Sequence, residues 1–183
     1  MAVREILRLG NPSLYESSEM VAEEESRALE GVVSDLHDTM MKFREEYQAG
    51  RAIAAPQIGV RKRLVYMNIK EPVVFINPII TPASDALMEV WDDCMCFPEL
   101  LVKVLRYQSC RITYRDLDWT ERQMHLTNDL SELLQHEVDH LDGILAVSRA
   151  IDAQSFALRS QRDFLTSEPV RATVNIDLPS VLA

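Results

Sequence analysis

The sequence lacks any long hydrophobic run. Within its 183 residues, no stretch approaches the roughly 20 consecutive apolar residues that a membrane-spanning helix requires. The first residues, 1–5, include an acidic side chain and lead into no apolar run, unlike a secretory signal. We therefore expect a cytoplasmic protein with no membrane partner.

Cysteines and basic residues are also scarce. The three cysteines, Cys94, Cys96 and Cys110, are too few and odd in number for the disulfide framework of a secreted protein. Nineteen Lys and Arg face 29 Asp and Glu, which gives a formal net charge of −10. This charge weighs against binding to nucleic acid backbones. We expect no direct nucleic acid contact, and thiols that are free, buried or bound to metal.

Internal repeats and low-complexity tracts are absent, and no linker divides the chain. Apolar residues make up 47% and charged residues 26% of the sequence, a balance typical of soluble globular proteins. We therefore predict one domain over residues 1–183, in which residues 152–183 have no assigned role.

Two periodic segments predict helices. Residues 23–47 carry apolar side chains at three- and four-residue spacing, which indicates one helix with its apolar stripe toward the core. A second helix is predicted over residues 130–141, capped by Asn128 or Asp129 and ended by Gly143. Residues 156–165 are expected to form a last helix.

Segments rich in β-branched and aromatic residues lie between the first two helices. Strands are predicted over residues 63–69, 73–80, 87–91, 110–114 and, more weakly, 123–126. The order of helix, strands and helix favours an α+β fold, with helices packed on mostly antiparallel sheets and the second helix at the centre.

The second predicted helix carries His136 and His140 on one face, because residues four apart lie about one turn apart. Both imidazoles can reach one metal ion, and Glu137 beside them can handle the proton of a water. A catalytic site needs a third ligand. No histidine follows His140, whereas Cys94 and Cys96 lie upstream. The alternative is a helix with two solvated histidines and two buried thiols.

Three motifs in fixed order resemble those of the peptide deformylase family. The third motif, Gln-His-Glu-x-Asp-His-Leu, is complete over residues 135–141. The first, normally Gly-x-Gly-apolar-Ala-Ala-x-Gln, appears over residues 50–57, and the second, normally Glu-Gly-Cys-Leu-Ser, over residues 92–96. Residues 6–14 are similar to the family's N-terminal segment. The resemblance extends over about residues 4–148.

The resemblance implies a single divalent metal ion held by Cys94, His136 and His140, with Cys94 rather than Cys96 in the motif position. Iron(II) is the usual ion of the family, and zinc, nickel or cobalt can replace it. A thiolate with two imidazoles suits several of these ions, so the residues alone do not choose among them.

The resemblance also implies a reaction, the hydrolysis of the formyl amide at the N-terminus of N-formylmethionyl peptides. Glu137 would be the general acid and base. The side-chain amide of Gln57 and the backbone N–H of Met95 would stabilise the oxyanion. The implied partners are N-formylated peptides, including nascent chains at the ribosome, or a small N-formyl compound.

Several residues depart from the family motifs. Ala52 and Asp93 replace glycines, and Cys96 replaces a serine. Asp92 replaces a glutamate that usually pairs with a downstream arginine, for which Arg106 is the candidate here. None of these changes removes a ligand, an oxyanion donor or the acid/base.

The family's methionine pocket corresponds to Arg51, Ala52, Asp129, Glu132 and Leu133. Three of these residues are charged, where the family has apolar ones. In one interpretation the charges are solvated and the substrate is formylmethionyl. In another, an Arg51–Glu132 pair adapts the pocket to a polar or charged N-formyl or N-acyl substrate. A catalytically weak binding homologue is a third hypothesis, which the intact catalytic groups disfavour.

Overall fold

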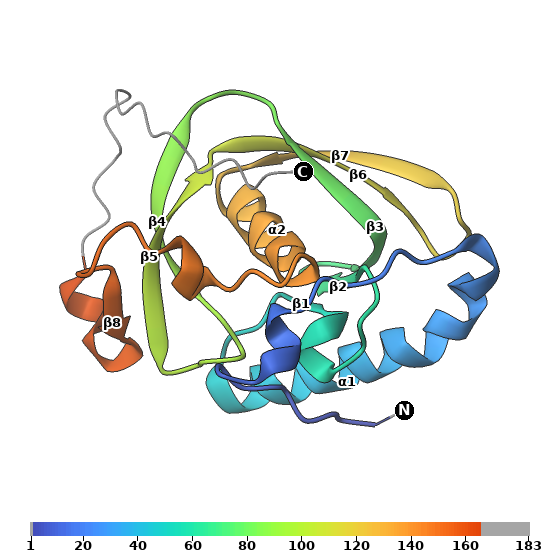
Figure 1. The fold of residues 1–183 in the computed structure, drawn as a ribbon, viewed down its shortest axis with the longest axis horizontal. Helices are drawn as coiled ribbons and strands as arrows, with labels where there is room; N and C mark the ends of the chain where they lie inside the picture. Colours follow the sequence, from blue (N-terminus) through green and yellow to red (C-terminus); the bar gives the residue numbers. More distant parts are fainter. Residues whose placement is uncertain (1, 166–183) are drawn as a thin grey trace.

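The computed structural model describes residues 2–165, and these form the α+β fold that the sequence predicts. Two antiparallel sheets have the strand orders β1-β2-β3-β6-β7 and β4-β5-β8. Helix α2 (Asn128–Leu141) lies between the two sheets (Figure 1). Helix α1 (Glu30–Tyr47) packs against β1 and β2 on the other face of the larger sheet.

The larger sheet contains β1 (Ala52–Ala54), β2 (Leu64–Asn68), β3 (Pro72–Pro82), β6 (Ser109–Arg115) and β7 (Glu121–Thr127). The smaller sheet contains β4 (Leu87–Asp93), β5 (Leu100–Tyr107) and β8 (Phe156–Leu158). Short 3₁₀ helices are η1 (Pro12–Tyr15), η2 (Glu23–Leu29), η3 (Ala55–Ile58), η4 (Ala146–Arg149) and η5 (Arg159–Phe164).

Strand β2 is buried on both faces, which explains its unbroken apolar sequence. Successive side chains of a strand point to opposite faces. Leu64 and Tyr66 therefore join the core under α1, whereas Val65 and Met67 join the core under α2. The strand thus fixes both helices against one sheet and sets where the buried face of α2 lies.

The end of α2 agrees with the prediction. The helix ends at Leu141, and Gly143 follows with a φ of +72°, in the left-handed region that favours glycine. A Cβ at this position would lie 2.6 Å from the backbone oxygen of Tyr15. The glycine therefore allows both the turn and the close approach of the N-terminal segment.

The start of α2 differs from the prediction. The N-cap is Thr127, and Asn128 and Asp129 belong to the first turn. Strand β7 runs directly into the helix, because the N–H of Asn128 still donates to the backbone oxygen of Gln108 at 2.8 Å. Asn128 makes the change of direction with a φ of 49°, a conformation that asparagine tolerates better than most residues.

Two other helix predictions are corrected. Residues 23–29 form η2 rather than the start of α1, where the Glu25 side chain accepts from the N–H of Ala22 at 2.8 Å. Residues 156–158 form β8, because the exposed edge of β5 offers them backbone pairing at Leu100–Val102. Residues 159–164 then form the 3₁₀ helix η5, so a short strand and a 3₁₀ helix replace the single helix predicted over residues 156–165.

All five predicted strands are confirmed, as β2, β3, β4, β6 and β7. Strand β5 was not predicted, although its sequence is rich in leucine and valine. The three cysteines are buried free thiols, as expected. Within residues 2–165, no helix is long and apolar enough to cross a bilayer.

Candidate metal centre and substrate cleft

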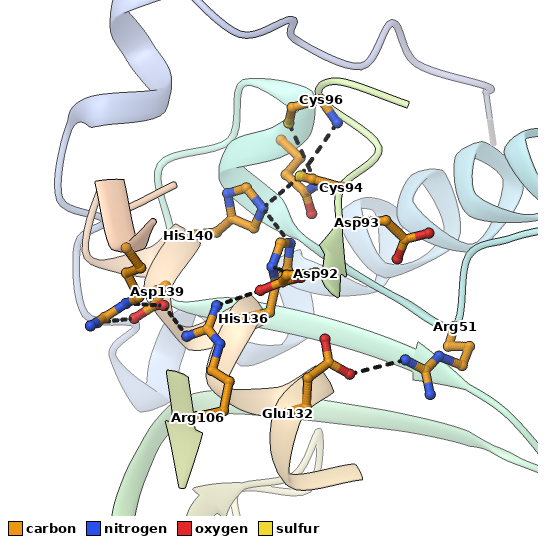
Figure 2. Close-up of polar contacts among 12 residues, drawn as sticks. Arg51, Asp92, Asp93, Cys94, Cys96, Arg106, Glu132, His136, Asp139 and His140 are labelled. Carbon is orange, nitrogen blue, oxygen red and sulfur yellow. Dashed lines mark hydrogen bonds and ion pairs between the residues drawn. The ribbon is translucent and has the colours of Figure 1, made fainter. Parts of the chain in front are cut away.

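Three potential metal ligands converge at the buried face of α2. His136 and His140 lie one helical turn apart, with their Nε2 atoms 3.2 Å from each other. Cys94 follows the last residue of β4, and its Sγ lies 3.2 Å from Nε2 of His140 (Figure 2). All three side chains are buried, and their donor atoms lie within 4.8 Å of one another. The structure thus brings together the three residues that the motifs single out.

The chemistry of this donor set fits a divalent transition metal. Bonds of about 2.3 Å to sulfur and about 2.0 Å to nitrogen would place neighbouring donors roughly 3.5 Å apart in a tetrahedral site, near the observed separations. Burial raises the pKa of the Cys94 thiol and lowers the pKa of His140. A bound cation favours both a thiolate and a neutral imidazole, so it would relieve this penalty on the thiolate.

His136 is oriented by a carboxylate behind it. Asp92 Oδ1 lies 2.8 Å from His136 Nδ1, and Asp92 Oδ2 accepts from Arg106 at 2.7 Å. Burial disfavours charge on the imidazole, but the Asp92 carboxylate outweighs it and raises the pKa of His136 to about 10. The Asp92–Arg106 pair expected from the sequence is present, and it keeps Nε2 of His136 directed at the other donors.

The network continues beyond the predicted pair. Arg106 also contacts Asp139 on α2, as Figure 2 shows. Arg149 of η4 binds both oxygens of Asp139, at 2.6 Å each. The sequence analysis did not predict the roles of Asp139 and Arg149. Asp139 belongs to the recognised motif, but its partners lie on other elements and are revealed only by the fold.

Glu137 is buried and lines a cleft that also reaches Cys94 and His136. Burial raises the pKa of its carboxyl group to about 7. Its Oε2 has no hydrogen-bond partner among the residues that the structure describes. A carboxyl group that titrates near neutral pH and has a free oxygen is suited to take up and return a proton.

Gln57 of η3 has a fixed orientation. Its Oε1 accepts from the N–H of Ala54 at 2.7 Å, which directs the NH₂ group to the sulfurs of Cys94 and Cys96, at 3.8 and 3.6 Å. Met95 is buried between these two cysteines and lines the same cleft. Gln57 and Met95, the two candidate oxyanion donors, are therefore next to the candidate metal ligands.

Charged side chains form one wall of the cleft. Arg51 lies 2.5 Å from Asp129 and 3.3 Å from Glu132. The Glu132 side chain is only 12% exposed and lines the cleft together with Ala52 and Leu133. Asp129 is 80% exposed and reaches the cleft only through Arg51. The predicted pocket residues therefore gather at the cleft, except that Asp129 lies at its rim.

The cleft is also lined by an ion pair that was not predicted from the sequence. Arg159, the first residue of η5, binds Asp93 at 2.7 Å and the backbone oxygen of Pro98 at 2.6 Å. Arg159 belongs to the segment that had no predicted role, yet it lines the cleft. The sequence does contain one indication of this pair. Asp93 replaces a motif glycine beside Cys94, and a carboxylate at that position needs a cationic partner nearby.

Comparison with known proteins agrees with this fold and arrangement of residues. The family model described as polypeptide deformylase matches residues 3–156. The chain belongs to the peptide deformylase family, as its motifs predicted.

Individual relatives are similar over most of their length. Peptide deformylase 1 of Prochlorococcus marinus (strain MIT 9313) is 36% identical over 175 residues, which cover 88% of each chain. The crystal structure of a peptide deformylase from Legionella pneumophila gives a TM-score of 0.73 at 32% identity, over 81% of this chain and 86% of the other. A Met-Ala-Ser-bound class I type b peptide deformylase from Acinetobacter baumannii gives 0.74 at 26% identity, over 81% and 98%.

Proposed function

We propose that this chain hydrolyses the formyl amide at the N-terminus of N-formylated peptides, with the N-formylmethionyl ends of newly made polypeptides as substrates. The observation that carries the proposal is the convergence of Cys94, His136 and His140 beside Glu137 in one cleft. Iron(II) is the proposed ion, with zinc, nickel or cobalt as substitutes, and the cytoplasm is the proposed location.

Cys94, His136 and His140 would hold a divalent ion, which would supply Lewis-acid chemistry for the activation of water near neutral pH and the polarisation of the formyl carbonyl. Glu137 accepts the proton of the attacking water as its oxygen bonds to the formyl carbon. Gln57 Nε2 and the backbone N–H of Met95 donate to the carbonyl oxygen as negative charge develops there. Glu137 then protonates the amide nitrogen, the C–N bond breaks, and formate and a free α-amine are released.

Two features of the site support these roles. The raised pKa of Glu137 lets the carboxyl group exchange a proton at neutral pH. The hydrogen bond from the N–H of Ala54 to Oε1 of Gln57 holds the side-chain amide of Gln57 in place before substrate binds. Donors that are already fixed in a buried site need little reorganisation during the reaction. This preorganisation is the source of their stabilising effect on the transition state.

The decisive experiment is a turnover assay on formyl-Met-Ala-Ser. The purified chain would be loaded with iron(II) without oxygen, and in parallel with zinc, nickel and cobalt. We expect one formate and one new α-amine for each peptide cleaved, and no product with Glu137→Gln loaded in the same way. Absence of formate with every ion, from protein shown to contain metal, would contradict the proposal.

A further inference from the structure

Glu132 occupies an unusual place in the cleft. It lies four residues before His136 on α2 and therefore on the same face, about one turn away. The two residues line the same cleft, which Glu137 also lines. A substrate whose formyl group reaches the candidate metal centre would thus place its first side chain within reach of Glu132. The Glu132 side chain is only 12% exposed, so once a substrate fills the cleft its hydrogen bonds must come from the protein or from the substrate.

Arg51 satisfies only part of this need. A carboxylate has about four acceptor positions. Among the described residues, the hydrogen bond that Glu132 accepts comes from Arg51, at 3.3 Å. Arg51 makes a closer contact with Asp129, at 2.5 Å. One guanidinium is thus shared between two carboxylates, and the nearer partner is the exposed Asp129.

The second arginine of the cleft does not compensate for this excess of negative charge. Arg159 is bound to Asp93 and to the carbonyl of Pro98. Among the described residues, no second cation donates a hydrogen bond to the acceptor positions of Glu132 that Arg51 leaves open, since His136 and Arg106 act on it through their charge alone.

We propose that the cleft selects N-formyl peptides whose first side chain ends in a hydrogen-bond donor, an amide or an ammonium group, and that Glu132 is the residue that recognises the donor. This inference rests on the proposed deformylase function and narrows it: formylmethionyl peptides are cleaved, but less efficiently than formyl peptides whose first side chain ends in a donor. A methionine side chain would cover the carboxylate without pairing it, whereas a glutamine or lysine side chain would supply a partner. Sites built around a buried polar group strongly reject analogues that leave it unpaired.

The test is run at pH 8.5, where Glu132 is ionised because its pKa is raised to about 7. It compares five peptides, formyl-Xaa-Ala-Ser, with methionine, norleucine, glutamine, lysine or glutamate as the first residue. We expect kcat/KM for glutamine and lysine to exceed that for methionine by roughly 10-fold or more, as a lost buried hydrogen bond implies. Glutamate should be the poorest substrate, because its charge repels Glu132. Methionine equal to or better than both donors would overturn the proposal.

Variants of Glu132 assign the preference to this residue. Glu132→Leu should reverse the order, so that methionine and norleucine exceed glutamine and lysine. The double variant Arg51→Val/Glu132→Ile should raise kcat/KM for formyl-Met-Ala-Ser further, since it leaves no unpaired arginine. Glu30→Gln on α1 is the matched control, because it removes an exposed carboxylate on another helix. An unchanged order in Glu132→Leu would remove Glu132 from recognition.

A binding measurement separates selectivity from chemistry. The deformylated products Gln-Ala-Ser and Met-Ala-Ser would be titrated into metal-loaded wild type and Glu132→Leu by calorimetry. We expect tighter binding of Gln-Ala-Ser to the wild type and of Met-Ala-Ser to the variant. Efficient turnover of formyl-Met-Ala-Ser without a preference for donors overturns this inference alone. Absence of formate from all five peptides overturns the proposed function, and the selectivity with it.

Discussion

Among single residues, Cys94 and Cys96 have the same side chain, but their different surroundings give them different expected roles. Cys94 Sγ lies 3.2 Å from Nε2 of His140, whereas Cys96 Sγ accepts from Gln57 and the backbone N–H of Cys96 donates to Cys94 Sγ. We expect Cys94→Ala to lose most bound metal and Cys96→Ala to keep about one ion per chain, since three ligands with one open position define such a site. Elemental analysis measures the metal content of both variants, and an unchanged metal content in Cys94→Ala would exclude Cys94 as a ligand.

Glu137 adjoins a candidate ligand without belonging to the donor set. We expect Glu137→Ala to retain its metal and to lose turnover by at least about 100-fold, because the variant lacks the carboxyl group that transfers the proton. The measurements are metal content and kcat on one formyl peptide for wild type and variant. Near-normal turnover by the metal-loaded variant would exclude Glu137 as the acid/base.

Glu132 gives a prediction about pH. Burial and the nearby Asp92 carboxylate raise its pKa from 4.5 to about 7. Between these two values the folded chain holds a proton that the unfolded chain has released, so this group makes stability fall as pH rises. Glu132→Gln removes this pH-dependent loss of stability. The melting temperature of the variant relative to that of wild type should therefore rise between pH 5 and pH 8. Glu30→Gln is the control for the loss of one charge, and an equal gain there would refute the assignment.

Among the elements, the end of α2 is the most constrained. Gly143→Ala would place a Cβ 2.6 Å from the oxygen of Tyr15 at a φ of +72°. We expect a loss of stability of about 1–3 kcal/mol or more, because neither backbone segment can move away cheaply. Gly31→Ala is the matched control, since a Cβ there meets nothing within 4 Å and Ala is preferred in helices, so it should gain up to about 1 kcal/mol. Urea denaturation of both variants compares them, and equal effects would contradict the prediction.

Sequence periodicity predicted well the elements that are marked by their own side chains, whether they lie at the edge or in the middle of a sheet. The five predicted strands and the end of α2 follow from side-chain patterns and one glycine. The segment at residues 156–158 is different, because it becomes a strand only through pairing with β5. The start of α2 was also misplaced, since backbone pairing of β7 continues to Asn128. Local propensity does not encode either of these long-range contacts.

At the scale of the whole molecule, the motifs were sufficient to bring the candidate ligands, Glu137 and Gln57 to one place. The motifs did not predict the ion pairs that surround this site. The contact of Arg149 with Asp139 and that of Arg159 with Asp93 join motif residues to segments outside the motifs. Such pairs form where the fold brings opposite charges together, and one sequence does not show which charges will meet. The charged cleft wall was predicted as an alternative, but the Asp93–Arg159 pair was not.

The three candidate ligands come from two parts of the chain that β5, β6 and β7 separate. The complete set therefore exists only in the folded state, and metal binding should add stability that grows with the free metal concentration, by about 4 kcal/mol at 1,000 times the dissociation constant. We expect chelation to lower the melting temperature by roughly 10 °C for that energy. An unchanged melting temperature after verified metal removal would contradict this. In a cell, a chain deprived of its ion would unfold and be degraded more often, so the abundance of the protein would follow the supply of metal.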